Sequence, residues 1–178
     1  MRTLAVVALT LVLAGCGLTA SSENPGYVQF ETPEHTGLKH GTSISLGASV
    51  LRFAAKHTDN DPQARALMES LDGIQISVHK MSEEVDYEAL DMDIGVATAN
   101  AFDKDWSPIV RVVEDGSRVH VFVKEHSGIL QGLAIVAVDQ EELVFINMMG
   151  EIAPDNLRSW SSVVPHSESF ALITDSID

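Results

Sequence analysis

The chain has 178 residues, with 26 Asp and Glu against 11 Lys and Arg, and a formal net charge of −15. This acidic balance argues against a nucleic-acid partner, because phosphate binding needs clustered Lys and Arg. It also argues against a domain that lies flat on an anionic leaflet, which would repel it, and so favours a domain held off the membrane by a tether.

The first sixteen residues have the features of a secretory signal. Arg2 supplies a positive start, residues 4–13 form an apolar run, and the small residues Ala14 and Gly15 precede Cys16. This order is typical of a cleaved signal peptide. As a helix the apolar run would rise about 15 Å, half of the hydrocarbon core, so it does not predict a membrane-spanning helix.

The residues LAGC at positions 13–16 resemble a bacterial lipobox. The resemblance implies cleavage between Gly15 and Cys16 and a diacylglycerol thioether on Cys16, which would bind the chain to a membrane. Gly17 stands where many lipoproteins of the inner membrane have aspartate, so the expected location is the cell envelope, on the outer membrane facing the periplasm. The alternative is a buried or chance cysteine; since Cys16 is the only cysteine, no disulfide is expected.

Residues 16–41 predict a lipidated N-terminus followed by a flexible linker. They contain Gly, Pro, Thr and His with few apolar residues, and they have no helical or strand period. We therefore expect a signal peptide at 1–15, this linker at 16–41, a single folded domain at 42–164 and a weakly patterned tail at 165–178.

The first half of the expected domain alternates between short strands and helices. Thr42 begins an alternating strand, and the stretch GASVLRFAAKH that follows has a helical stripe. Asp61 and Pro62 predict the N-cap and first turn of a second helix, which Gly73 is expected to end. Residues 74–80 alternate as a strand with one buried face, and residues 82–105 carry apolar side chains at helical spacing.

The second half predicts four consecutive strands. Pro108 is expected to begin the first, Asp115-Gly116 closes a hairpin to the second, and GLAIVAV and ELVFINMMG form the last two. A short helix is predicted at 154–160. The expected fold is therefore α+β, with a mainly antiparallel sheet of these four C-terminal strands plus one or two earlier ones and helices packed on it.

These stretches resemble a known family. LDGIQISVHK, DWSPIVRVVEDGSRVHVFVKE, GLAIVAV and FINMMGEIAPDNL are similar to the domain of unknown function 4252 family of bacterial lipoproteins and secreted proteins, from about residue 42 to residue 160. The resemblance implies this fold and an envelope location. It implies no activity, substrate or catalytic residue.

The residues predict no catalytic or metal site and no cofactor. The histidines lack the spacing of a zinc site, apart from His35 and His40 with Glu34, which leave a weak metal site in the linker as an alternative. Asp59, Asp61, Asp91 and Asp93 do not continue as a calcium loop. No GxSxG motif or phosphate-binding loop is present, and an acylated Cys16 could not act as a nucleophile.

Two function classes follow, and one surface feature bears on them. The first class is an envelope lipoprotein with a non-enzymatic binding or regulatory domain; the second is a hydrolase or metal-dependent enzyme of unfamiliar type. The last two strands are apolar on both faces, so something must cover each face. The cover is a second helix layer, the C-terminal tail, or a partner, either an envelope protein or a second copy, bound at Val136, Ile146 and Met148.

Overall fold

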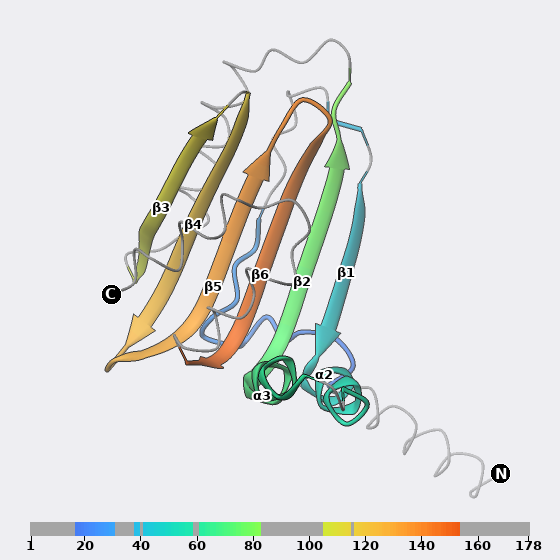
Figure 1. The fold of residues 1–178 in the computed structure, drawn as a ribbon, viewed down its shortest axis with the longest axis vertical. Coiled ribbons are helices and arrows are strands. Elements are labelled where there is room, and N and C mark those ends of the chain that lie inside the picture. The colour runs from blue at the N-terminus through green and yellow to red at the C-terminus, as the bar shows by residue number, and fades with distance from the viewer. Residues whose placement is uncertain are drawn as a thin grey trace, which may run out of the picture.

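A computed structural model of the chain describes residues 17–30, 38–39, 41–58, 61–82, 105–114 and 116–153. Within these ranges the chain forms a six-stranded antiparallel sheet with two helices packed on it, which confirms the predicted α+β class. The strand order is β1-β2-β6-β5-β4-β3, so the last four strands form a meander and the first two extend it at one edge (Figure 1).

The elements follow the predicted order with longer strands. They are β1 (Thr42–Gly47), α2 (Ala48–Ala55), α3 (Pro62–Ser70), β2 (Leu71–Lys80), β3 (Trp106–Glu114), β4 (Ser117–His126), β5 (Ile129–Val138) and β6 (Glu142–Ile152). The hairpin between β3 and β4 is confirmed, and Gly116 has a φ of +86°, a conformation that glycine adopts without strain. The helices predicted at 82–105 and 154–160 and the tail at 165–178 lie outside the described residues.

Two predicted element boundaries are wrong. Gly73 does not end α3, because the helix ends at Ser70 and β2 begins directly at Leu71. Gly73 instead lies within β2, where a Cβ atom would stand 2.7 Å from the Cβ of Ala20, so the absence of a side chain lets another segment approach. Pro108 does not begin β3 but follows Trp106 within it, at a sheet edge, where a missing N–H is tolerated.

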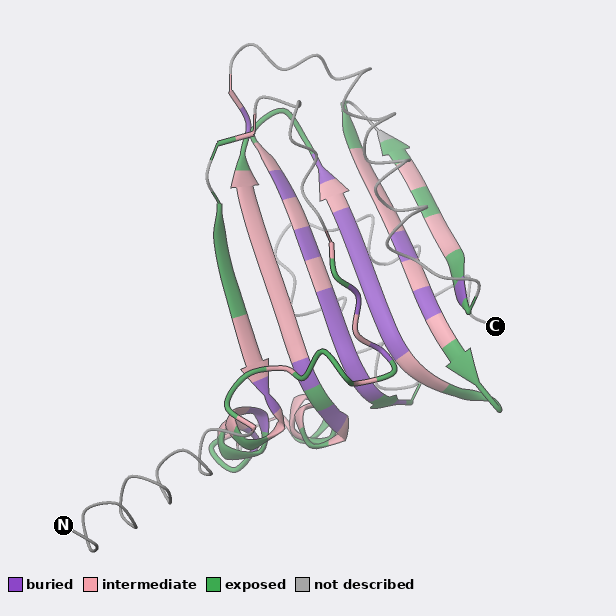
Figure 2. Cartoon of the chain, turned by 180° about the vertical axis from the view of Figure 1, so that it is seen from behind, coloured by how far each residue is buried: buried purple, intermediate pink, exposed green. Residues whose placement is uncertain are grey.

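The sheet carries a hydrophobic cluster on each face. The cluster on the first face joins side chains of β4, β5 and β6 to one side chain from each helix and to the start of β2: Leu51, Leu67, Leu71, Val121, Val123, Leu133, Ile135, Met148 and Ile152. The cluster on the second face includes a residue from the N-terminal segment: Val28, Met81, Trp106, Ala134, Val136, Val138, Leu143 and Phe145. Burial is concentrated in β5 and β6, in the middle of the sheet (Figure 2).

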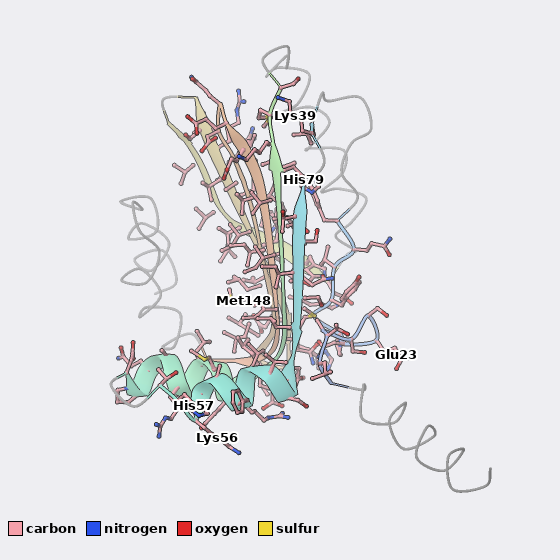
Figure 3. The ribbon with its side chains drawn as sticks, turned by 90° about the vertical axis from the view of Figure 1, so that its right-hand side faces the viewer. Glu23, Lys39, Lys56, His57, His79 and Met148 are labelled. Carbon is pink, nitrogen blue, oxygen red and sulfur yellow. The ribbon has the colours of Figure 1, made fainter. Side chains whose placement is uncertain are left out.

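The two helices lie side by side across one end of the sheet, where β1 ends and β2 begins (Figure 1). Seen edge-on in Figure 3, residues 17–30 lie along one side of the sheet, while α2 and α3 extend across its end toward the other. The end with the helices therefore also holds the first described residues after Cys16.

Candidate functional site

The described residues contain no cluster suited to metal binding. No group of three or more His, Cys, Asp or Glu side chains lies together in the part of the chain that the structure describes. His57 follows α2, His79 lies on β2, and His120 lies on β4. Among the same residues, no helix has the length and apolar character needed to cross a membrane. His35 and His40 of the alternative metal site lie outside the described ranges.

The three residues predicted as a partner surface do not form one surface. Val136 pairs with Phe145, whereas Ile146 pairs with Ile135, so Val136 and Ile146 lie on opposite faces of the sheet. Val136 and Met148 are both fully buried, and Ile146 is partly buried against the first cluster. The chain itself buries Val136 and Met148, so of the covers that the sequence left open a partner is not needed at these two residues.

The segment just after Cys16 is fixed to the end of the sheet. Cys16 and Gly15 lie outside the described residues, but the Gly17 carbonyl accepts a hydrogen bond from the Ser49 amide of α2 at 3.2 Å. The next residue, Leu18, accepts one from the Gly47 amide at 2.8 Å. The predicted flexible linker therefore needs correction for residues 17–30, which lie against the domain over their length.

The side chain of Asn147 fastens this segment to the second face. Asn147 is fully buried in β6; its Oδ1 accepts a hydrogen bond from the Val28 amide at 3.0 Å, and its Nδ2 donates to the Gly26 carbonyl at 2.9 Å. A longer bond of 3.3 Å runs from Nδ2 to the Leu133 carbonyl. The buried side-chain amide of Asn147 therefore provides hydrogen-bond partners for two backbone groups of residues 17–30, a segment that forms no strand.

Apolar packing adds to these hydrogen bonds. Val28 is 2% exposed within the second cluster, and the Phe30 ring stacks on Phe145 with centroids 4.7 Å apart. Gly26 lies so close to β5 that a Cβ atom would clash with the Gln131 carbonyl oxygen and touch the Gly132 backbone. Sequence reasoning missed this docking; its only local signal is the i, i+2 spacing of Val28 and Phe30.

The outward side of α2 is the most unusual surface among the described residues. Helical spacing places a set of exposed side chains on one line, here called the outer stripe of α2: Ser49, Arg52, Phe53, Lys56 and His57. Phe53 is 66% exposed, although it is large and apolar. The centroids of the Phe53 and His57 rings are 4.6 Å apart. Lys56 and His57 project from the lower end of the molecule in Figure 3.

Charge around the outer stripe is mixed. Arg52 forms an ion pair of 3.8 Å with Asp72, and both side chains remain more than half exposed. Leu18, in the segment after Cys16, is 56% exposed and is hydrogen-bonded to the residue that precedes α2. Basic and apolar groups therefore meet beside the start of the described chain.

The comparisons with known proteins identify the family and nothing finer. The family model for a domain of unknown function, DUF4252, matches residues 35–160, which is more than half of the chain. The chain belongs to this family, as the sequence resemblance indicated. No curated protein and no solved structure matches the chain. Residues 17–30 precede the matched range.

Proposed function

We propose that this DUF4252 protein is a bacterial envelope lipoprotein that is anchored by a lipid on Cys16 and carries a non-enzymatic binding or regulatory domain. The observation that carries the proposal is the LAGC sequence directly after an apolar run, at the only cysteine of the chain. The expected site is the outer membrane, facing the periplasm. The expected partners are the membrane and an envelope protein or a second copy.

Two features of the described residues support an anchored protein. The segment after Cys16 packs on the sheet through Asn147 and Val28, so a lipid on Cys16 would be joined to a segment that is part of the fold. Gly17 and Leu18 are hydrogen-bonded at the junction of β1 and α2. A protein whose mature chain begins at Cys16 would keep this entire segment.

The lipid is tested by Cys16→Ala in bacterial cells. The unaltered protein should require detergent for extraction, and mass spectrometry of its mature N-terminus should find a diacylglycerol adduct on Cys16. Cys16→Ala should yield an unprocessed or detergent-independent protein, whereas Ser22→Ala, a matched exposed change nearby, should behave as the unaltered chain. A free thiol on the mature N-terminus would reject the proposal.

The binding role is tested separately from the anchor. Crosslinking in intact cells followed by identification of what co-purifies should recover the same partner repeatedly. Hydrolysis of a peptide, ester or glycan substrate by the purified lipoprotein would instead favour the alternative of a hydrolase. If a chelator abolished that activity, the metal-dependent form of the alternative would be favoured.

A further inference from the structure

The outer stripe of α2 differs from what solubility alone would place on an acidic protein. The chain has a net charge of −15, yet this stripe presents Arg52 and Lys56 with no carboxylate of its own. Between the two cations lies Phe53, with two thirds of its surface exposed. An aromatic ring flanked by basic side chains is the composition that interfacial helices bury at the boundary between headgroups and acyl chains.

The position of the stripe relative to the anchor is fixed by the described residues. Cys16 is bonded to Gly17, so their Cα atoms are about 3.8 Å apart whatever the conformation. Gly17 is hydrogen-bonded to Ser49, the first residue of the outer stripe. Phe53 follows Ser49 by four residues, about 6 Å along a helix. A lipid on Cys16 would therefore enter the bilayer beside α2.

We propose that the outer stripe of α2 lies on the phospholipid surface that holds the lipid anchor, with Phe53 at the headgroup level and Arg52 and Lys56 against anionic headgroups. This inference rests on the proposed lipidation of Cys16. It replaces the expectation, drawn from net charge and a flexible linker, that the domain is held away from the membrane.

The acidic groups near α2 bear on this orientation. Acidic side chains at this end include Glu69, exposed on the neighbouring helix α3, and Asp72, which pairs with Arg52 and accepts a hydrogen bond from Asn24. Glu23 projects from the side of the sheet, whereas Lys56 and His57 project from its lower end (Figure 3). Interactions with acidic groups farther than about 10 Å from the bilayer are largely screened at moderate salt, so only the charges near α2 bear on the contact.

The inference is tested with a polarity-sensitive fluorophore on a single introduced cysteine. In the mature lipoprotein the Cys16 thiol is blocked by the lipid, so Phe53→Cys offers one reactive thiol. Val113→Cys on β3 is the matched control, because Val113 is 60% exposed and lies on the edge strand opposite β1. Each full-length lipoprotein is reconstituted into phosphatidylcholine–phosphatidylglycerol vesicles with brominated acyl chains.

A docked outer stripe predicts quenching at position 53 that is about threefold or more stronger than at position 113, because interfacial helices bury their apolar face in the acyl boundary. In the Phe53→Cys background, the double change Arg52→Gln and Lys56→Gln should lower the ratio of docked to undocked protein by up to roughly 25-fold, since each cation near an anionic surface contributes about fivefold. Arg111→Gln with Arg118→Gln, the same charge change in the β3–β4 hairpin, should leave the quenching unchanged.

The outcomes separate the two proposals. Equal or absent quenching at positions 53 and 113, with a lipid found on Cys16 by mass spectrometry, overturns the docking and leaves the lipoprotein assignment standing. A mature chain without lipid overturns both. Circular dichroism of each labelled protein confirms the fold, which these exposed positions should not disturb.

Discussion

Helices α2 and α3 lie side by side at one end of the sheet, yet their N-termini are completed in different ways. At α3, the Asp61 side chain accepts hydrogen bonds from the amides of Gln63 and Ala64, at 3.0 and 2.9 Å. At α2, the N-cap residue Gly47 makes no side-chain bond, and the Gly17 carbonyl accepts the Ser49 amide instead. The start of α3 is thus specified locally, whereas that of α2 depends on a distant segment.

The exposed side chains of the two helices differ as well. The exposed side chains of α3 are polar, small or acidic: Pro62, Gln63, Ala66 and Glu69. Those of α2 and its C-cap include two cations, Arg52 and Lys56, and the exposed Phe53. Helix α3, whose exposed side chains are typical of a solvated surface, is also the helix whose N-terminus is capped locally, by Asp61. The helix with the unusual surface is the one joined to the segment that follows Cys16, which links its exposed chemistry to the anchor.

Among substitutions that test this difference between α2 and α3, Asn147→Leu is expected to have the largest effect on stability. The change would leave the Val28 amide and the Gly26 carbonyl without their buried partner, so the free energy of unfolding should fall by about 2–4 kcal/mol. Hydrogen exchange should then speed up at the Ser49 amide of α2 but not at the Ala64 amide of α3. Urea unfolding and exchange mass spectrometry measure the two quantities.

The matched control is Gln63→Leu, which replaces an exposed amide side chain. Its effect on the free energy of unfolding should stay within about 0.5 kcal/mol. If Asn147→Leu were as mild as the control, the segment would contribute little to the fold and the dependence of α2 on it would be rejected.

A smaller effect, at α3 rather than α2, is expected from Asp61→Ala. Loss of an N-cap carboxylate should lower the free energy of unfolding by about 1 kcal/mol. Exchange should quicken at the Gln63 and Ala64 amides while the Ser49 amide stays protected. Glu69→Ala, which removes an exposed acid from the same helix, is the control. If the Gln63 and Ala64 amides exchanged at the same rate in Asp61→Ala and Glu69→Ala, the Asp61 cap would not stabilise the start of α3.

The same contrast explains how much of the fold could be predicted from sequence. The pair Asp61-Pro62 and the turn residue Gly116 act on their immediate neighbours, and the structure confirms the cap of α3 and the β3–β4 hairpin. Short apolar runs likewise predicted β5 and β6. Each of these signals depends on a few consecutive residues, so no knowledge of the tertiary structure was needed.

The docking of residues 17–30 could not be predicted in this way. Its central contact joins Val28 to Asn147, which is 119 residues away in the sequence. Gly73 was interpreted as a helix end because its real role, admitting Ala20 close to β2, also depends on that segment.

The candidate site could not be predicted from local sequence either. Val136 and Met148 stood out as apolar, but only the fold shows that the chain itself buries them. Phe53 was counted with Leu51 in the apolar stripe of the helix, whereas the fold buries Leu51 and leaves Phe53 exposed.

The smallest effect on stability, and the one that sharpens the contrast at the membrane, is expected from Asp72→Asn. The Arg52–Asp72 pair spans 3.8 Å with both side chains more than half exposed, and such pairs contribute little, so the free energy of unfolding should change by less than about 0.5 kcal/mol.

Asp72→Asn also removes one negative charge beside the outer stripe and releases Arg52 toward anionic headgroups. Quenching of the fluorophore at position 53 should therefore rise in phosphatidylglycerol vesicles and stay constant in phosphatidylcholine alone. Asp105→Asn, which alters the ion pair of 3.9 Å between exposed Asp105 and the largely buried Lys124, should leave the quenching unchanged. A rise in both vesicle types would mean that charge does not hold α2 at the surface, and a fall would mean that Asp72 orients Arg52 for the contact.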